Sequence, residues 1–394
     1  MTSILAPTFS ILIKSLFFCL LPVNLFSQSL TISEKLASRD FPSVFQAWNM
    51  ADNLPGEPTE QTISRHDLFF TSAYGLKLVW DNQLEGLATG FTLESLKEAK
   101  SYKKLLQDYN PNIITIVEIR YRDSPSSYLP ADSKWWMRDQ SGKLVYGWEE
   151  GGFIRTELRD SSFQNQIARQ AAAVIRTGIA DGVMLDWWDE KEYPEARLSI
   201  LKKIRKNIED EGLILLNSNQ EEIPMSAPYA NGIFMECWDS SDESVDKWKK
   251  YQSTLEWAEK NMRKPQINCL ETWLKDTRNE LNRMRATTVL ALTRSNGFCL
   301  FSDPNPLPTP DHLHNWYPFY NAKLGKPAEP GTKRTDQAWQ RRYSNGTAVY
   351  NPLGNSPISV LFEKKHKSVT TGKISKTHQI AEFDGDIFLI TKEK

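Results

Sequence analysis

The stretch Asp181-Gly182-Val183-Met184-Leu185-Asp186-Trp187-Trp188 indicates the fold of this chain most directly. Its apolar residues are continuous and do not alternate with polar ones, which is typical of a parallel strand buried on both faces. Seven further runs share this character. The eight expected strands span residues 44–49, 67–72, 112–119, 182–187, 213–219, 232–238, 265–273 and 298–303.

Amphipathic patterns fill most of the gaps between these strands and indicate helices. They span residues 92–108, 161–176, 195–211, 244–261 and 278–293, with a weaker one at 57–64 and a last one at 311–324. Strand and helix repeated about eight times predict an α/β protein of the (β/α)8 TIM-barrel class. An open doubly wound sheet is the alternative, but no Gly-x-Gly-x-x-Gly turn follows any of the strands.

The pattern changes near the C-terminus from helices to short strands and turns. Strands are expected at 346–351, 358–363 and 379–391, the last broken at Asp384-Gly385-Asp386. We therefore expect a signal peptide at 1–29, a barrel at 30–330 and a small β-rich C-terminal module at 331–394 that packs on the barrel.

The N-terminus has the features of a secretory signal. Lys14 precedes a short apolar run at 16–25, and small residues flank Gln28 where cleavage is expected. A membrane anchor is the alternative, although Pro22 interrupts a run that is short for a span. The sequence therefore predicts a secreted or periplasmic protein.

Composition limits the classes of partner. The formal net charge is −1, whereas nucleic-acid binding needs a surplus of Lys and Arg. The same balance gives no reason to expect binding to anionic lipid, and no cofactor motif appears. Of four cysteines, Cys19 lies in the expected signal, and Cys237, Cys269 and Cys299 lie in strand-like runs, where buried free thiols are expected. The oligomeric state stays open.

Carboxylates stand at the C-terminal ends of the expected strands, where barrel enzymes carry their catalytic groups. These are Glu118, Asp186, Glu236, Glu271 and Asp303. Cleavage of a glycosidic bond needs two carboxyl groups, one as acid and one as nucleophile or base. Each could instead be structural; Glu118, for example, has Arg120 and Arg122 close by. Asp186 and Glu236 are the strongest candidates because each ends an apolar run and is followed by aromatic residues.

Aromatic and amide side chains share these strand ends. The flat rings of the thirteen tryptophans suit the faces of sugar rings, and Trp188 and Trp238 are the best placed as sugar subsites. With the three remaining carboxylates, the expected substrate-binding residues are Trp48, Asn49, Glu118, Trp187, Trp188, Asn217, Asn219, Trp238, Glu271, Trp273 and Asp303.

A long insertion, residues 123–155, separates the third and fourth strands. It holds Trp135, Trp136 and Trp148, with a hairpin expected at Gln140-Ser141-Gly142. Because loops that follow barrel strands lie over the ligand-binding end, we expect the insertion to form a wall of the cleft.

Three motifs in order carry a resemblance to a known family. They are Asp181–Trp188 as quoted, Asn231-Gly232-Ile233-Phe234-Met235-Glu236, and Arg342-Tyr343-Ser344-Asn345-Gly346-Thr347-Ala348-Val349-Tyr350-Asn351-Pro352. Over roughly residues 41–363 the chain resembles glycosyl hydrolase-like family 15 and, more distantly, the barrel endo-α-1,4-polygalactosaminidases. The resemblance implies a hydrolase of polysaccharides or oligosaccharides. It also implies Asp186 and Glu236 as the catalytic carboxylates, as nucleophile and general acid respectively or in the reverse roles.

Two other functions remain open on the sequence. A non-catalytic glycan-binding barrel would keep the aromatic residues without needing a carboxylate pair, so the question is whether Asp186 and Glu236 face one cleft. A metal-dependent hydrolase or deacetylase would need His312, His314 and an acid to converge, although no metal is expected.

Overall fold

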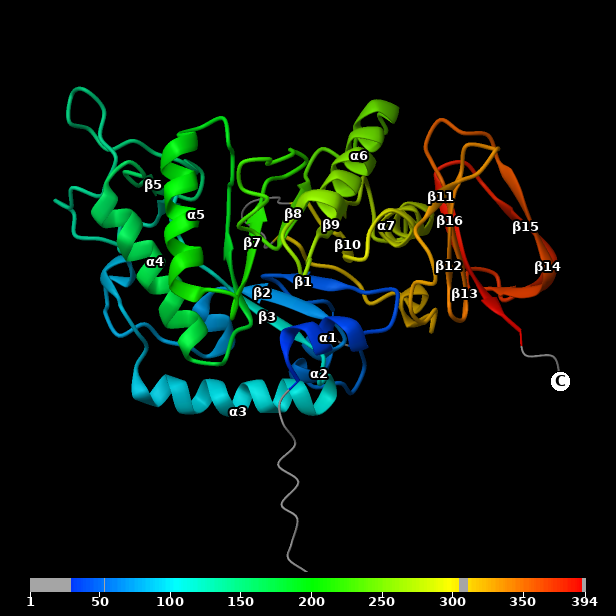
Figure 1. Ribbon diagram of the computed structural model, residues 1–394, viewed down its shortest axis with the longest axis horizontal. Helices are drawn as coiled ribbons and strands as arrows, with labels where there is room; N and C mark the ends of the chain where they lie inside the picture. The colour runs from blue at the N-terminus through cyan, green and yellow to red at the C-terminus, as the bar shows by residue number, and fades with distance from the viewer. Residues whose placement is uncertain (1–29, 53, 305–310, 392–394) are drawn as a thin grey trace, which may run out of the picture.

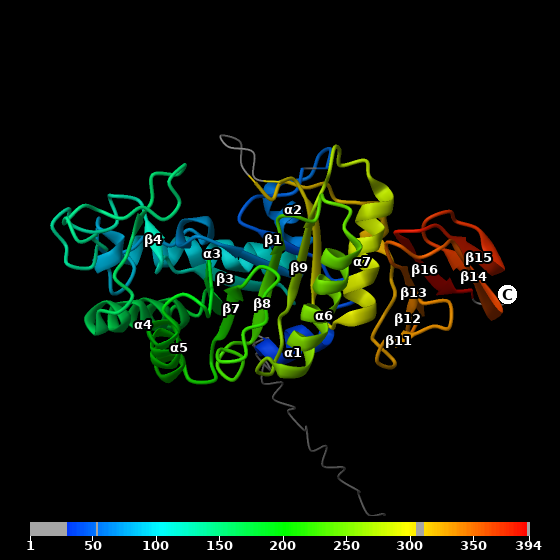
Figure 2. The ribbon, with the colours of Figure 1, turned by 90° about the horizontal axis from the view of Figure 1, so that it is seen from above.

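The computed structural model describes residues 30–52, 54–304 and 311–391 (Figure 1). The expected signal peptide at 1–29 lies outside the described residues. A body of strands and helices forms one part of the molecule, and an antiparallel sheet lies beside it at the C-terminal end (Figure 2). None of the described helices is long and apolar enough to cross a membrane.

Eight parallel strands form a nearly closed barrel, which confirms the predicted fold class. Their hydrogen-bonded order is β1 (Phe45–Ala47), β2 (Leu68–Thr71), β3 (Ile114–Glu118), β6 (Gly182–Leu185), β7 (Leu213–Asn217), β8 (Gly232–Cys237), β9 (Cys269–Trp273) and β10 (Phe298–Ser302). A parallel bridge between Val44 and Cys299 links the first and last strands. All eight expected strands are present.

The core has two layers because side chains alternate along each strand. The inward-facing residues pack into one apolar cluster that fills the barrel and includes Phe70, Met184, Leu215 and Phe234. Outward-facing residues such as Val183 pack against the helices in a second, larger cluster. Cys237, Cys269 and Cys299 are buried free thiols, as expected.

The Asp-Gly and Asn-Gly pairs that open β6 and β8 have packing reasons. A Cβ atom on Gly232 would lie 2.5 Å from the carbonyl oxygen of Ile267, which precedes β9, so glycine lets the start of β8 approach this segment. Asp181 accepts hydrogen bonds from Lys35 at 2.8 Å and from the Thr115 amide at 2.9 Å. These motifs therefore stabilise the end of the barrel opposite to the catalytic candidates.

Helices cover the outside of the barrel (Figure 1). They include α2 (Thr59–Ser64), α3 (Leu93–Tyr109), α4 (Ser161–Arg176), α5 (Pro194–Ile208), α6 (Val245–Asn261) and α7 (Leu281–Arg294), each close to its expected range, after an N-terminal α1 (Ile32–Ser38). The expected helix at 311–324 is wrong. The segment is irregular, with one 3-10 turn, η3 (Pro318–Asn321). Pro318 interrupts a helix there, and the side chains of His312 and His314 are buried.

The C-terminal sheet has the order β11-β12-β13-β16-β14-β15 and is antiparallel. Its strands are β11 (Thr332–Lys333), β12 (Trp339–Tyr343), β13 (Gly346–Asn351), β14 (Ile358–Ser368), β15 (Ile374–Ile380) and β16 (Asp384–Ile390). The expected break at residues 384–386 is wrong: these residues belong to β16, and the turn lies at 381–383, where Phe383 has φ of 50°. The sequence pattern misleads here because Gly385 is required by packing and not by a turn.

This sheet packs on α7 of the barrel (Figure 2). A Cβ atom on Gly385 would lie 2.1 Å from Val289 on that helix, so the backbones meet closely. Arg285 pairs with both carboxylate oxygens of Asp384, at 2.8 and 2.7 Å, and the Tyr343 hydroxyl donates to the Leu292 carbonyl at 2.7 Å. The strands of the sheet thus complete the cover of α7.

Candidate active site

Polar side chains close the top of the apolar barrel interior. Asp186 stands two residues after Met184, and Glu236 two residues after Phe234, both of which face inward. The period of two along a strand therefore turns these carboxylates inward as well. The same parity applies to Glu118, Asn217, Glu271 and Ser302. The ring of strand-end residues thus converges above the core.

Asn217 joins the two principal carboxylates. Its side-chain nitrogen donates to Asp186 Oδ1 and to Glu236 Oε2, each at 2.8 Å. The side chain of Asn217 is buried, whereas the two carboxylates are partly exposed and line cavities. Asp186 and Glu236 therefore face one cleft, on β6 and β8, with Asn217 on the strand between them.

Asp186 and Glu236 differ in pKa because their surroundings differ. Burial, and then the charge of Glu118, raises the pKa of Asp186 to about 6, against the lowering effect of Asn217 and Arg120. Burial raises the pKa of Glu236 further, to about 8; His312 lowers it, while Asp186 and Glu271 raise it. Glu236 is thus the acid that holds a proton at neutral pH, and Asp186 the one that ionises first.

Glu118 and Glu271 belong to the surrounding network. Glu118 accepts a hydrogen bond from the Trp48 indole at 2.8 Å and pairs with Arg120 at 3.1 Å. Glu271 is fully buried and accepts from Ser302 and from Nδ1 of His312, the latter at 2.8 Å. Both carboxylates therefore orient aromatic side chains that border the cleft.

His312 and Asp303 complete this network from the loop after β10. Burial lowers the pKa of His312, but Glu271, Asp311 and Glu236 outweigh it and raise the pKa well above its usual value. The resulting imidazolium offsets the charge of the carboxylates around it. Asp303, by contrast, accepts hydrogen bonds from Nε and Nη2 of Arg278, at 2.7 and 2.6 Å, and lines neither of the two cavities described below.

Two cavities meet at the carboxylate pair. The smaller, of about 270 Å³, is lined by Trp48, Asn49, Arg120, Asp123, Trp148, Phe153, Asp186, Trp187, Glu236, Asp311 and His312. The larger, of about 620 Å³, is lined by Trp148, Glu150, Trp187, Asn217, Asn219, Glu236, Trp238 and Trp273. We call them the polar cavity and the tryptophan cavity. Glu236 lines both, whereas Asp186 lines only the polar cavity.

The tryptophans divide into exposed and buried ones. Trp187 and Trp238 are 48% and 54% exposed, and both line the tryptophan cavity, as does Trp273. The expected subsite at Trp188 is wrong: this side chain is only 2% exposed, donates to Ser226 at 2.9 Å and packs against Tyr121. Trp188 does not follow the inward period of Met184 and Asp186, because the chain leaves strand geometry at Trp187, where φ is 52°, and the Trp188 ring packs in the core.

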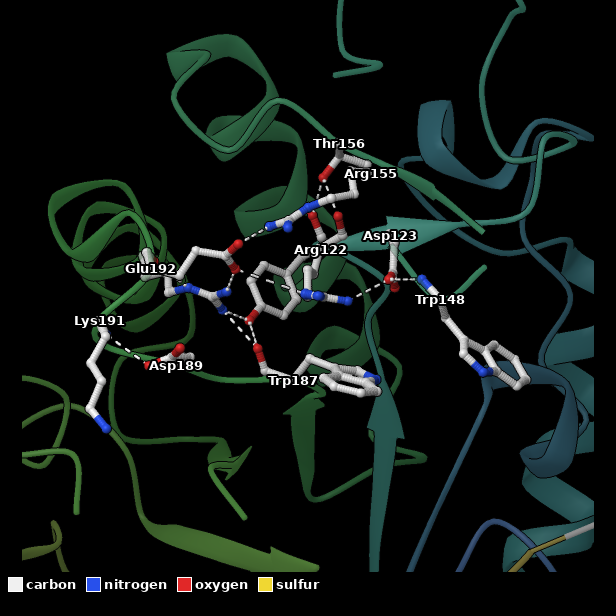
Figure 3. Close-up of polar contacts among 11 residues, drawn as sticks. Arg122, Asp123, Trp148, Arg155, Thr156, Trp187, Asp189, Lys191 and Glu192 are labelled. Carbon is white, nitrogen blue, oxygen red and sulfur yellow. Dashed lines mark hydrogen bonds and ion pairs between the residues drawn. The ribbon is translucent and has the colours of Figure 1, made fainter. Parts of the chain in front are cut away.

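Trp187 is fixed by its surroundings (Figure 3). The Arg122 guanidinium lies 4.7 Å from the centre of its ring, and Asp123 holds Arg122 at 2.6 Å. The Trp187 carbonyl accepts hydrogen bonds from Tyr121 and Arg197. One face of this exposed ring is therefore occupied by a cation, and the ring's orientation is set before any ligand arrives.

The insertion at 123–155 reaches the cleft with only part of its aromatic residues. It begins with β4 (Asp123–Ser124), ends with β5 (Ile154–Arg155), and contains the expected hairpin, closed between Asp139 and Lys143. Trp148 lines both cavities, and its amide donates to Asp123 at 3.1 Å. Trp135 and Trp136 instead pack in hydrophobic clusters. The wall is therefore formed around Trp148 and Phe153.

Backbone strain gathers at this rim. Trp48, Trp187, Asn219 and His312 all have positive φ, between 43° and 56°, and all lie in segments that follow barrel strands. Such conformations are costly for residues other than glycine and cluster at functional sites. All four of these residues line one or both of the cavities at the carboxylate pair.

Other parts of the molecule are weaker candidates. A cavity of about 610 Å³ lies at the opposite end of the barrel, where its lining acid Asp181 is paired with Lys35, and none of the expected site residues lines it. In the described ranges, no three His, Cys, Asp or Glu side chains are grouped as a metal site. His312 contacts two carboxylates, and His314 contacts His66 at 2.9 Å.

Sequence reasoning did not single out Arg122, Asp123, Phe153 or Asp311, all of which support or line the cleft. Arg122, Phe153 and Asp311 lie outside the strands, and Asp123 lies in the two-residue strand β4, so the period of the barrel strands does not place their side chains. Arg122 and Asp123 do have a signal: they continue β3 by a few residues, on the end of the barrel where catalytic groups stand.

Solved glycosidases share the fold of this chain. A maltogenic α-amylase from Thermotoga neapolitana has a TM-score of 0.54 at 10% identity, over 90% of this chain and 100% of that one. An α-amylase from Malbranchea cinnamomea gives 0.53 at 9%, over 91% and 97%. A β-L-arabinopyranosidase from Geobacillus stearothermophilus gives 0.52 at 11%, over 91% and 99%. At these identities the likeness shows the fold alone.

Comparison of the sequence with known families and proteins gives a match to one family. No curated protein sequence matches the chain. Residues 187–347 match the family model described as hypothetical glycosyl hydrolase family 15, from the end of the Asp181–Trp188 motif into the C-terminal sheet. This match supports a glycosidase-like function. The resemblance to glycosyl hydrolase-like family 15 that the three motifs indicate is thereby confirmed over this part of the chain.

Proposed function

We propose that this protein is a retaining glycoside hydrolase in which Asp186 is the nucleophile and Glu236 the general acid and base. One observation carries the proposal. Because one nitrogen of Asn217 lies 2.8 Å from an oxygen of each carboxylate, those two oxygens are no farther apart than twice 2.8 Å. This upper bound on one pair of oxygens fits the retaining enzymes, whose carboxyl groups lie about 5 to 5.5 Å apart, better than the inverting enzymes, which leave about 6.5 to 9.5 Å for a water molecule.

The reaction proceeds in two steps. The Asp186 carboxylate attacks the anomeric carbon while Glu236 transfers its proton to the glycosidic oxygen, so the bond between carbon and oxygen breaks and the leaving sugar departs as an alcohol. Asp186 is then joined to the remaining sugar as an ester. In the second step the Glu236 carboxylate takes a proton from water, which attacks the same carbon and releases Asp186.

The assignment of roles follows from the two pKa values. A general acid must be protonated at working pH, and Glu236, with a pKa of about 8, meets that need. A nucleophile must be ionised, and Asp186, with a pKa of about 6, is mostly carboxylate at neutral pH. Asn217 donates to both groups and so stabilises the charge on whichever is ionised.

The rival function, a glycan-binding barrel without catalysis, has less support. Binding alone gives no reason for two close carboxyl groups with separated pKa values, and such pairs are typical of acid–base catalysis. Export of the chain is also part of the proposal. It rests on the sequence pattern of residues 1–29, and the N-terminal residue of protein secreted by an expression host would test it.

The test is a screen of the purified mature protein on a panel of polysaccharides, read as new reducing ends. We expect the wild type to release reducing ends from at least one of them, and Asp186→Asn and Glu236→Gln each to lower that release by about a thousandfold or more. Asp67→Asn is the matched control. Asp67 also has a pKa raised to about 6 by burial, but it lies at the start of β2, at the other end of the barrel.

An Asp67→Asn protein with near-normal turnover, beside inactive Asp186→Asn, supports the assignment. Near-normal turnover by folded Asp186→Asn or Glu236→Gln protein would remove that residue from the mechanism. Tight binding of a polysaccharide with no reducing ends from it, for wild type and variants alike, would favour the glycan-binding barrel.

A further inference from the structure

We propose that the two cavities are opposite sides of the cleavage point. The polar cavity holds the sugar that becomes bonded to the enzyme, and the tryptophan cavity binds the leaving part of the chain, through a sugar without acidic groups. This inference rests on the proposed function and extends it to the direction in which the substrate lies.

The placement of the two carboxylates assigns the sides. A nucleophile touches the anomeric carbon, so the sugar that carries this carbon must lie where Asp186 is accessible, and Asp186 lines only the polar cavity. The general acid must reach the oxygen between the two sugars, and Glu236 lines both cavities. The tryptophan cavity therefore starts on the leaving-group side of that oxygen.

The chemistry of each lining agrees with this assignment. The polar cavity offers charged and hydrogen-bonding groups, among them Arg120, Asp123 and the His312 imidazolium, which can contact the hydroxyl groups of one sugar from several sides. Its volume, about 270 Å³, is less than half that of the tryptophan cavity. Charged and hydrogen-bonding groups placed close to a reacting sugar stabilise the charge that develops on it.

The tryptophan cavity is richer in indole rings: four of its eight lining residues are tryptophans, against three of the eleven that line the polar cavity. Arg122 occupies one face of Trp187, and the exposed remainder of that ring borders a cavity to which Trp148, Trp238 and Trp273 also contribute. Flat apolar rings suit the faces of pyranose units. Among the described residues, no Lys or Arg lines this cavity, whereas the carboxylate of Glu150 does, so a uronic acid or a sulfated sugar would meet no compensating positive charge.

The experiment compares two substrates with the same reacting sugar. One is the oligosaccharide of the polysaccharide that the screen identifies, and the other is the glycosyl fluoride of the sugar that it releases. Fluoride is a single-atom leaving group, so its substrate fills the polar cavity and leaves the tryptophan cavity empty. Fluoride release is followed with an ion-selective electrode and oligosaccharide cleavage by chromatography.

We expect Trp238→Ala to lower kcat/KM for the oligosaccharide about tenfold or more and to leave kcat/KM for the glycosyl fluoride within about twofold of wild type. Trp238→Phe, which keeps a ring, restores most of the loss. Asn49→Ala, in the polar cavity, lowers kcat/KM for both substrates. Trp238 is half-exposed, so its removal does not disturb the core, and the thermal midpoint of the variant verifies this.

Two results for Trp238→Ala would overturn the inference. An equal loss of kcat/KM on both substrates, or a loss on the glycosyl fluoride alone, would place the reacting sugar in the tryptophan cavity. Faster cleavage of uronic-acid oligosaccharides than of neutral ones would contradict the proposed sugar class. A wild-type protein that cleaves neither type of substrate refutes the proposed function itself, and so is distinguishable from an active enzyme with the reverse pattern.

Discussion

At the scale of single residues, Asp186, Asn217 and Glu236 should decide the pH dependence of activity. The proposed mechanism needs Asp186 ionised, so we expect kcat/KM to rise as pH passes its pKa of about 6. It needs Glu236 protonated, so kcat/KM falls as pH passes about 8. We expect a bell-shaped profile with a maximum near pH 7, whose two limbs belong to the coupled pair.

The profile is measured as initial rates between about pH 4 and pH 10 on the substrate from the screen. With a glycosyl fluoride, which needs little help from an acid, the limb at high pH should weaken while the limb at low pH remains. A rate that still climbs above pH 9 on the oligosaccharide would show that Glu236 is not the acid.

The same carboxyl group affects stability. The folded pKa of Glu236, about 8, lies above the ordinary value of 4.5, so between these values the folded state binds more protons than the unfolded one. The Glu236 contribution to stability is therefore greatest at low pH and is lost as pH rises through this range. Glu236→Gln has no such loss and can still accept the hydrogen bond from Asn217.

Urea denaturation at several pH values tests this effect. The free energy of unfolding of Glu236→Gln, relative to wild type, should increase by a few kcal/mol between about pH 5 and pH 9. A difference that does not change with pH would mean that Glu236 titrates at its ordinary value in the folded protein.

Trp188 and Trp238 should affect stability differently when each is replaced by alanine. Trp188 is 2% exposed and donates to Ser226, so Trp188→Ala should lower the free energy of unfolding by about 3 to 5 kcal/mol. Trp238 is 54% exposed, and Trp238→Ala should change it by less than about 1 kcal/mol. Chemical denaturation of both variants measures this, and equal effects would contradict the separation of core from cleft.

The sequence predicts the positions of some of these side chains and not of others. Asp186 and Glu236 are predictable because each continues the inward parity of a buried strand. Trp188 is not, because the chain leaves strand geometry at Trp187, where φ is 52°, and the two rings separate into cleft and core. Nothing in the local sequence of Asn217 indicates that it joins carboxylates on two neighbouring strands, since that contact spans separate segments.

At the scale of elements, the strands are the most predictable because burial on both faces leaves a continuous apolar run. The five longer helices carry amphipathic patterns that end close to where the helices end. The segment after β10 fails as a predicted helix because its histidines are held by tertiary partners, Glu271 for His312 and His66 for His314. Within the insertion, pairing of β4 with β5 brings Trp148 to the cleft, a contact that depends on folding over a long loop.

At the scale of the whole molecule, the C-terminal sheet packs on the outside of the barrel. It covers α7, whose Val289 meets Gly385 and whose Arg285 binds Asp384. The predicted boundary at residue 330 therefore does not imply independence. A protein ending at residue 330 would expose this face, and we expect it to aggregate or to unfold without cooperativity.

Circular dichroism melting of the truncated and full-length mature proteins measures this dependence. A soluble fragment with a cooperative transition within about 5 °C of the full-length protein would show that the barrel is stable without the sheet. The sequence could indicate that the module is small, but the close contact with α7 depends on packing that no local pattern encodes.

In the proposed mechanism Asp186 forms a covalent bond to the sugar, and mass spectrometry of the protein can detect that bond. Glu236→Gln protein is mixed with the glycosyl fluoride of the sugar released in the screen, which reacts without the acid, and is quenched in acid and digested. We expect one glycosyl unit on the peptide that contains Asp186, and none in Asp186→Asn protein treated alike. A glycosyl unit on another carboxylate, or turnover with inversion at the anomeric carbon and no adduct, would contradict it.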